Sequence, residues 1–342
     1  MRLEYEVQEL RTSEPFHIAR ATDPHGRRNV RGRLTTDDGV GGVGEAAPNA
    51  LYGETAETVL AVLPRFAVIL EGEPEPFPVM RMEAALEVAV RRNPAARAAI
   101  SAALHDLVGK RLGQPVWRLW GLDPGAAPRS SYTLGMAGPE ESREKARRAA
   151  GRPVLKIKVG RPDDEARLRA IREEAPDALL YVDANTAWTA KEALRRMPML
   201  EEMGVAFVEQ PLHPADREGL RLLRRRARLP IVADESCETA ADIPPLLGAV
   251  DGINIKLAKA GSLSEARRMA GMARAHGLIV MLGCMLESTL GIAAAVQLAP
   301  LMDYLDLDGA LLLAEDPFTG PGMNHDGTIR FNDAPGLGVS PR

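Results

Sequence analysis

The sequence has little of what marks secreted, membrane-spanning or nucleic-acid-binding proteins. Two cysteines in 342 residues cannot form a disulfide framework and are typical of a reducing compartment. The longest apolar stretch, residues 277–286, is about half of the roughly 20 residues that a bilayer-spanning helix needs. The first ten residues are charged and alternating, unlike a secretory signal, and a net charge of −4 does not favour nucleic acid or an anionic membrane as a partner. We therefore expect a soluble, cytoplasmic protein that acts on a small molecule and forms a homo-oligomer.

Lysine is also scarce. Of 43 basic residues only 7 are lysines, which leaves 36 arginines. Lysine can lose its proton near neutral pH and arginine cannot, so the positions of the few lysines are informative. Four of the seven form two clusters, each inside or just after a strand-like apolar run: Lys156 and Lys158, and Lys256 and Lys259.

From residue 130 onward the sequence alternates short apolar runs with amphipathic helical stretches. Polar residues within or at the end of five consecutive runs are separated by 27, 26, 25 and 22 positions, about the length of one strand and one crossover helix; they are Lys156, Asp183, Glu209, Asp234 and Lys256. Eight such runs predict an α/β fold with a TIM-type barrel of parallel strands. A doubly wound sheet is the alternative, but no Gly-x-Gly-x-x-Gly follows the first run. The predicted strands are 131–136, 154–158, 179–183, 205–209, 230–234, 252–256, 278–283 and 304–308, with helices at 161–175, 189–203 and 262–276 between them.

Residues 1–125 have a different pattern. Antiparallel strands are predicted over 2–11, 30–36 and 40–46, with a turn at Asp38-Gly39, and helices over 54–70 and 93–112. We interpret this segment as an α+β capping domain and residues 126–311 as the barrel domain with the catalytic site. Residues 312–342 are rich in turn signals and contain no further strand–helix unit, so we expect them to return to the capping domain.

Three consecutive predicted strands end in a carboxylate: Asp183, Glu209 and Asp234. In a barrel of this type the carboxyl ends of the strands face the active site, where three converging acids would repel one another without a cation. Mg²⁺ prefers carboxylate oxygens and keeps positions open for water or substrate. Acids at strand ends can instead cap the following helices, but Glu209, followed by Gln210-Pro211, fits that role poorly. A magnesium site is the favoured interpretation.

The lysine-bearing strands are the second and the sixth, opposite each other in a barrel of eight. A substrate carboxylate bound to Mg²⁺ would then have a lysine on each face, an arrangement suited to moving a proton on and off the adjacent carbon. The metal stabilises the enediolate that forms, and a lysine can act as base if neighbouring cations lower its pKa. A lysine or histidine base with magnesium is the general description of enolase-superfamily sites.

These residues resemble the enolase superfamily, muconate-lactonising subgroup, and within it the dipeptide epimerases of the L-Ala-D/L-Glu epimerase kind. The resemblance covers essentially the whole chain and implies a modified (β/α)7β barrel with a capping domain. It implies Asp183, Glu209 and Asp234 as magnesium ligands, Lys158 and Lys256 as the acid/base pair, and Lys156 as an electrostatic helper beside the substrate carboxylate. The motifs that carry it are Lys156-Ile157-Lys158, Asp183-Ala184-Asn185, Glu209-Gln210-Pro211, Asp234-Glu235-Ser236 and Asn254-Ile255-Lys256-Leu257.

The last predicted strand indicates which reaction of the subgroup the chain catalyses. Asp306 and Asp308 resemble the Asp-x-Asp element with which dipeptide epimerases hold the substrate's α-ammonium, and two acids on one strand face suit a cation. The stretch Gly283–Ser288, with Met285, also resembles these epimerases. Asn185 and Met285 are further candidates for substrate contact.

The loop over residues 15–28 corresponds to the family's specificity loop. In Ala-Glu epimerases an arginine of this loop can bind the glutamate side chain, and Arg20 is the candidate here. Other residues of the loop could also reach the substrate: Asp23, His25, Arg27 and Arg28. We therefore predict magnesium-dependent epimerisation of the C-terminal residue of an L,L-dipeptide, with L-Ala-L-Glu as the candidate substrate.

Alternatives remain at this point. An N-acylamino acid racemase, an o-succinylbenzoate synthase or a muconate cycloisomerase of the same subgroup would place an anionic or neutral group beside Asp306 and Asp308, which are poor neighbours for it. A Schiff-base aldolase could use Lys256, but it would not need three adjacent acids. A non-catalytic protein on the same scaffold is disfavoured because every residue needed for catalysis is present.

Overall fold

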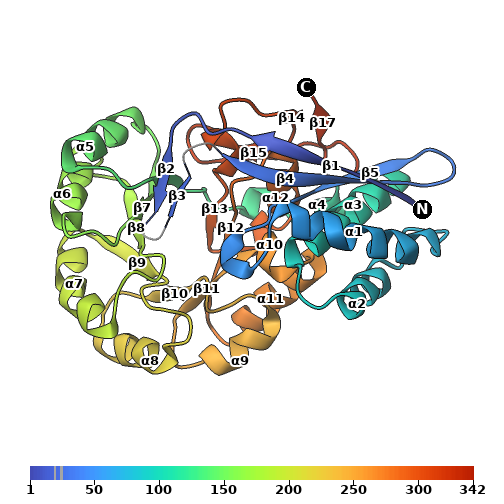
Figure 1. Ribbon diagram of the computed structural model, residues 1–342. Helices are drawn as coiled ribbons and strands as arrows, with labels where there is room; N and C mark the ends of the chain where they lie inside the picture. Colours follow the sequence, from blue (N-terminus) through green and yellow to red (C-terminus); the bar gives the residue numbers. More distant parts are fainter. Residues whose placement is uncertain (19–20, 24–25) are drawn as a thin grey trace.

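The computed structural model describes residues 1–18, 21–23 and 26–342. Figure 1 shows a barrel ringed by helices, green to orange, with a smaller α+β part in blue packed over one side of it. None of the helices in the described residues combines the length and the apolar character needed to cross a bilayer.

Eight parallel strands form the barrel in simple sequential order, from β6 to β13. The first and last strands meet at a single bridge between Ser130 and Leu305, which closes the barrel. The strands are β6 (Tyr132–Leu134), β7 (Val154–Lys158), β8 (Leu179–Asp183), β9 (Val205–Glu209), β10 (Ile231–Ala233), β11 (Gly252–Lys256), β12 (Ile279–Gly283) and β13 (Tyr304–Asp306). Four of the eight have the predicted bounds, and the other four are shorter than predicted.

A helix or helix pair follows each of the first seven barrel strands, and β13 leads directly into the short helix η5 (Gly309–Leu312). The predicted (β/α)7β barrel is therefore confirmed. The local sequence begins these helices as expected: Thr189 and Glu192 form a capping box at α7, and Ser262 caps α11. The helices are α5 (Pro139–Arg148), α6 (Asp164–Glu174), α7 (Ala190–Glu202), α8 (Arg217–Arg226), η3 (Ala240–Asp242) with α9 (Ile243–Leu246), α10 (Leu257–Ala260) with α11 (Leu263–Ala275), and α12 (Thr289–Val296) with η4 (Ala299–Leu301).

The interior of the barrel is filled by its own apolar layer. Tyr181, Phe207, Val232 and Met281 are buried together, and the rings of Tyr181 and Phe207 stack at 4.4 Å. This packed floor leaves the polar residues of the same strands to gather at the carboxyl ends.

The N-terminal part contains an antiparallel sheet in the order β1 (Arg2–Leu10), β4 (Arg27–Thr35) and β5 (Gly41–Ala46). Strand β4 begins three residues earlier than predicted because its register with β1 continues to the Leu10–Arg27 pair. The hairpin β2 (Phe16–Ile18) and β3 (Ala21–Asp23) lies within the predicted specificity loop. The remaining elements before the barrel are η1 (Ala50–Tyr52), α1 (Ala56–Glu71), α2 (Val79–Ala89), α3 (Pro94–Leu112), α4 (Val116–Leu119) and η2 (Pro124–Ala126).

The sequence patterns do not predict helix α2 or the close packing of α3 on β5. Helix α2 was not predicted, and its start, after Pro78, has no side-chain cap to signal it. Helix α3 is buried over most of its surface and packs closely on β5. The close approach requires glycine: a Cβ added at Gly42 or Gly44 would lie 2.0 Å from the carbonyl oxygen of Ala103 or Ala99.

The chain after the barrel lies against the N-terminal part. The backbone N–H of Leu337 donates to Asp106 of α3 at 2.8 Å, and Val116 N–H donates to Gly336 at 3.0 Å. Thr12 and Leu313 form an antiparallel bridge. Two short pairs complete this segment: β14 (Phe318–Thr319) with β17 (Ser340–Pro341), and β15 (Gly322–Met323) with β16 (Ile329–Arg330). The exact boundaries at 125 and 311 stay a prediction.

Candidate active site

Three buried carboxylates meet at the carboxyl ends of β8, β9 and β10. Asp183 and Glu209 are the last residues of their strands, and Asp234 directly follows β10. One oxygen from each lies within 4.8 Å of the others, so the three can hold one metal ion. Oxygen donors are those that a hard cation such as Mg²⁺ prefers. Burial and the Asp183 carboxylate raise the pKa of Glu209 to about 7, which is the expected sign of acids brought together without full compensation.

The backbone is strained just after two of these acids. Asn185 and Thr186 have φ of 43° and 69°, and Gln210 has φ of 34°. Non-glycine residues rarely adopt this left-handed region, and such strain is often found at functional sites. The Asn185 side chain donates to Asp183 Oδ2 at 3.2 Å, so the predicted substrate-contact residue also orients a predicted metal ligand.

Lys156 is the cation closest to the centre of the acidic group. Its Nζ lies 2.7 Å from Asp306, 2.8 Å from Glu209 and 3.2 Å from Asp183, and its side chain is almost fully buried. Although burial opposes the charge, these carboxylates raise the pKa of Lys156 well above its usual value. Lys156 is therefore a fixed positive charge between the acids and the last strand.

Lys158 and Lys256 lie on β7 and β11, which are four strands apart in the eight-stranded order and so on opposite sides of the barrel. Lys158 Nζ is 2.6 Å from Asp183 Oδ2, and Lys256 Nζ is 2.7 Å from Asp234 Oδ2. Burial favours the neutral amine, but the adjacent Asp234 carboxylate outweighs it and raises the pKa of Lys256.

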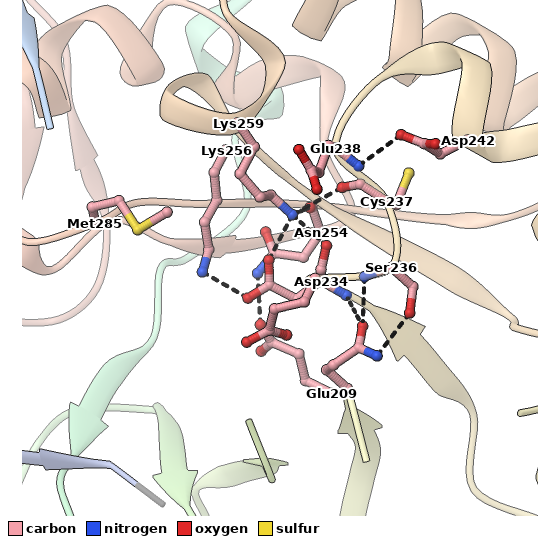
Figure 2. A network of polar contacts seen from close by, with 12 residues as sticks. Glu209, Asp234, Ser236, Cys237, Glu238, Asp242, Asn254, Lys256, Lys259 and Met285 are labelled. Carbon is pink, nitrogen blue, oxygen red and sulfur yellow. Dashed lines mark hydrogen bonds and ion pairs between the residues drawn. The ribbon is translucent and has the colours of Figure 1, made fainter. Parts of the chain in front are cut away.

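The Asp234 carboxylate is held from both sides, as Figure 2 shows. Lys256 binds Oδ2, and the fully buried Lys259 lies 2.6 Å from Oδ1. Lys259 also donates to the backbone carbonyls of Asp234, Cys237 and Asn254. Together the two ammonium groups outweigh burial and hold the pKa of Asp234 well below its usual range.

Two supporting residues have no assigned role in the sequence analysis. Lys259 was noted only as a member of a lysine cluster, and Asn254, which donates to Glu209 Oε1 at 2.8 Å, only as part of a motif. A signal existed for Asn254: it is two residues before Lys256 on the same strand, so both side chains point into the barrel. Lys259 follows in the short helix α10, where strand alternation gives no guidance.

Asp306 and Asp308 lie at and just beyond the end of β13, and both are buried. Asp306 pairs with Lys156, and Asp308 Oδ2 accepts a hydrogen bond from the backbone N–H of Thr133 at 2.6 Å. Burial and the Asp306 carboxylate raise the pKa of Asp308 to about 6. Two neighbouring carboxylates repel each other when both are ionised, so together they form a site suited to a cationic group.

A pocket joins these groups to the N-terminal part. The three predicted lysines, both aspartates of the last strand, Asn185 and Met285 all line it. Its opposite wall comes from the N-terminal part and includes Arg27, Asn29, Asn49 and Tyr52. Arg20 lies outside the described residues. Arg28 is directed elsewhere, since it forms an exposed ion pair with Glu57.

Comparison with known proteins agrees with this geometry. Residues 3–121 match the N-terminal domain of the mandelate racemase/muconate lactonizing enzyme family, and residues 141–342 match the enolase C-terminal domain-like family. The chain belongs to the mandelate racemase/muconate lactonizing enzyme family. This places it in the enolase superfamily, as the motifs indicated.

Similar proteins within the family are named for one reaction. The chain is 36% identical to the L-Ala-D/L-Glu epimerase of Bacteroides thetaiotaomicron over 99% of this chain and 88% of that one. It is 38% identical to the hydrophobic dipeptide epimerase of Roseobacter litoralis over 99% and 98%. The crystal structure of a dipeptide epimerase from Enterococcus faecalis, complexed with Mg and L-Leu-L-Tyr, superposes with a TM-score of 0.92 at 33% identity and covers 99% of both chains.

Proposed function

We propose that the protein is a magnesium-dependent dipeptide epimerase that inverts the α-carbon of the C-terminal residue. The observation that carries this proposal is the placement of two lysines, Lys158 and Lys256, on opposite sides of one buried group of three carboxylates. The similarity to dipeptide epimerases over nearly the whole chain supports it over the racemase, synthase, cycloisomerase and aldolase alternatives.

The two lysines exchange protons with opposite faces of the substrate. The neutral amine of one removes the α-proton, which passes from carbon to its Nζ, and the ammonium of the other gives its own proton to the opposite face. Each lysine thus ends in the protonation state that the other had at the start, and one turnover inverts the carbon. The reverse reaction uses the same two groups in exchanged roles, which a reversible epimerisation requires.

Asp183, Glu209 and Asp234 would hold the metal. Bound Mg²⁺ supplies positive charge next to the substrate carboxylate, where negative charge develops when the α-proton leaves. Two of these carboxylates, Asp183 and Asp234, pair with Lys158 and Lys256. Sharing Asp234 with a bound divalent cation would weaken the main interaction that raises the pKa of Lys256. Lys156 adds a further fixed positive charge beside Asp183 and Glu209.

Asp306 and Asp308 would bind the α-ammonium of the dipeptide, which distinguishes it from an N-acylated amino acid. The side chain of the epimerised residue would face the wall from the N-terminal part. L-Ala-L-Glu is the first candidate, with Arg20 as the predicted contact and Asn185 and Met285 lining the same pocket. In this scheme residues 1–125 and 312–342 form the cap and residues 126–311 the catalytic barrel, in a cytoplasmic homo-oligomer.

The proposal is tested by α-hydrogen exchange, followed by NMR in D₂O with Mg²⁺. The substrates are L-Ala-L-Glu, L-Ala-L-Phe and L-Ala-L-Lys. We expect exchange with inversion at the C-terminal residue of at least one dipeptide and its loss on addition of EDTA. If no dipeptide exchanges but an N-acylamino acid does, the metal–lysine site stands and the ammonium role of Asp306 and Asp308 is wrong.

A further inference from the structure

The seam where the barrel closes is held mainly by side chains. Beside the single bridge between Ser130 and Leu305, the hydroxyl of Ser130 accepts a hydrogen bond from Leu307 N–H at 2.8 Å. The backbone N–H of Thr133 donates to Asp308 Oδ2 at 2.6 Å. The segment that carries Asp306 and Asp308 is therefore fixed by residues at the start of the first barrel strand.

Within this seam, Ser131 makes a direct contact with a predicted ammonium-binding carboxylate. Its hydroxyl donates to Asp306 Oδ1 at 2.9 Å, while Thr133 Oγ1 approaches the same oxygen at 3.4 Å. The other oxygen, Oδ2, is bound by Lys156 at 2.7 Å. The orientation of the Asp306 carboxylate is thus set by donors on both oxygens, and at Oδ1 the Ser131 hydroxyl makes the shorter of the two bonds.

The direction of the Ser131 hydroxyl is determined by Tyr181, which lies in the interior of the barrel. Tyr181 OH donates to Ser131 Oγ at 2.5 Å. Tyr181 is fully buried in the apolar floor of the barrel, stacked on Phe207. A buried phenol needs a hydrogen-bond partner, and because it donates to Ser131, the one proton of the serine is left for Asp306. The three residues form a chain with one direction, from Tyr181 through Ser131 to Asp306.

We propose that Ser131 is a positioning residue that orients Asp306 toward the substrate's ammonium group, and that Tyr181 sets the direction of the Ser131 hydroxyl. This inference rests on the proposed function and extends it. It predicts that both residues matter for the ammonium group and not for the rest of the substrate.

The test compares two ligands that differ only in that group: L-Ala-L-Glu and its deamino analogue N-propionyl-L-glutamate. Dissociation constants are measured by calorimetry with Mg²⁺, for wild type, Ser131→Ala, Tyr181→Phe and Ser130→Ala. A hydrogen bond to a charged group contributes about 1.5 kcal/mol or more, so we expect Ser131→Ala to weaken dipeptide binding about tenfold. The analogue should change less than about twofold, and Tyr181→Phe should weaken dipeptide binding about threefold, in the same direction but less.

Ser130→Ala is the matched control because it removes a neighbouring buried hydroxyl that is hydrogen-bonded to two backbone groups, the Ser131 carbonyl and Leu307 N–H. We expect it to lower the melting temperature and to change the ratio of the two dissociation constants less than Ser131→Ala does, because Asp306 keeps its side-chain donors. Equal weakening of both ligands by Ser131→Ala would overturn the inference, as would unchanged dipeptide binding. If Ser131→Ala fails to fold, Tyr181→Phe decides by the same comparison.

Failure of the inference and failure of the proposed function give different results. If wild type neither binds nor exchanges any dipeptide of the library, the proposed function is wrong and the inference falls with it. If wild type exchanges a dipeptide and prefers it to its N-propionyl analogue, but Ser131→Ala keeps that preference, only the inference is wrong. With a preferred substrate other than L-Ala-L-Glu, that dipeptide and its own N-propionyl analogue replace the pair.

Discussion

Lys156 and Asp306 lie 2.7 Å apart and join the second strand of the barrel to the last, across the intervening first strand. Lys156 also contacts Glu209 and Asp183. The pair therefore connects the predicted metal site with the predicted ammonium site. A single buried lysine holds both groups of acids in one arrangement.

The first prediction concerns the ammonium site. Asp306→Asn removes the negative charge of the carboxylate that is the partner of Lys156 and the proposed partner of the substrate's ammonium group. We expect kcat/KM for a dipeptide to fall about 10- to 100-fold, mainly through KM, because a charge-assisted hydrogen bond is lost. Steady-state kinetics measure this, with Asp333→Asn, whose side chain is 81% exposed, as the control. An unchanged KM for Asp306→Asn would contradict the ammonium role.

The second prediction concerns the metal. Mg²⁺ that binds the folded protein and not the unfolded chain should raise the melting temperature of wild type, and EDTA should reverse the rise. Glu209→Gln replaces a proposed ligand carboxylate by an amide, so it should lose most of this stabilisation and weaken Mg²⁺ binding at least tenfold in calorimetry. Glu202→Gln, on the exposed side of α7, should behave as wild type. Equal Mg²⁺ affinity in both variants would exclude Glu209 as a ligand.

The third prediction uses a buried acid outside the metal site. Burial and the nearby Glu45 carboxylate raise the pKa of Glu287 to about 8, whereas an unfolded glutamate titrates near about 4.3. Between these values folding takes up a proton, so the stability associated with this group is present at low pH and is lost as the pH rises toward 8. Glu287→Gln cannot ionise, so its free energy of unfolding relative to wild type should increase from pH 5 to pH 8.5. Urea unfolding in EDTA checks this, and a difference that stays constant or decreases with pH would contradict it.

The fourth prediction concerns the contact between β5 and α3. Gly44→Ala places a Cβ 2.0 Å from the Ala99 carbonyl oxygen, so the helix must move away, and we expect a loss of roughly 1–3 kcal/mol in the free energy of unfolding. Gly271 in α11 has open space around its Cβ position, so Gly271→Ala should stabilise by about 0.5–1 kcal/mol. Denaturant unfolding of both variants measures the difference. Equal effects of the two substitutions would mean that the close approach is not important for stability.

Much of the fold follows from periodic patterns in the sequence. The spacing of polar residues at the strand ends matches one strand plus one crossover helix and so predicts the parallel barrel. Because the carboxyl ends of parallel strands meet at one edge, the residues at these ends are expected to lie close together. The same argument predicts that Asp183, Glu209 and Asp234 lie together, and the structure places them within reach of one ion. Lys158 and Lys256 are predicted on opposite sides of the barrel because they lie on the second and sixth of eight strands.

Other features depend on tertiary contacts that a linear pattern does not encode. The chain of hydrogen bonds from Tyr181 through Ser131 to Asp306 joins residues 50 and 175 positions apart. The pKa of Lys256 is raised by the Asp234 carboxylate, whose distance of 2.7 Å from the lysine the sequence does not give. Helix α2 lacks a capping side chain that would have marked its start.

The central claim is that Lys158 and Lys256 act on opposite faces of one α-carbon. It is tested most directly by following α-hydrogen exchange of the L,L- and L,D-dipeptides in D₂O with Mg²⁺, separately for Lys158→Ala and Lys256→Ala. The account predicts that neither variant epimerises, and that each exchanges the α-hydrogen of only one isomer, a different isomer for each variant. A variant that still inverts the carbon, or two variants that exchange the same isomer, would contradict it.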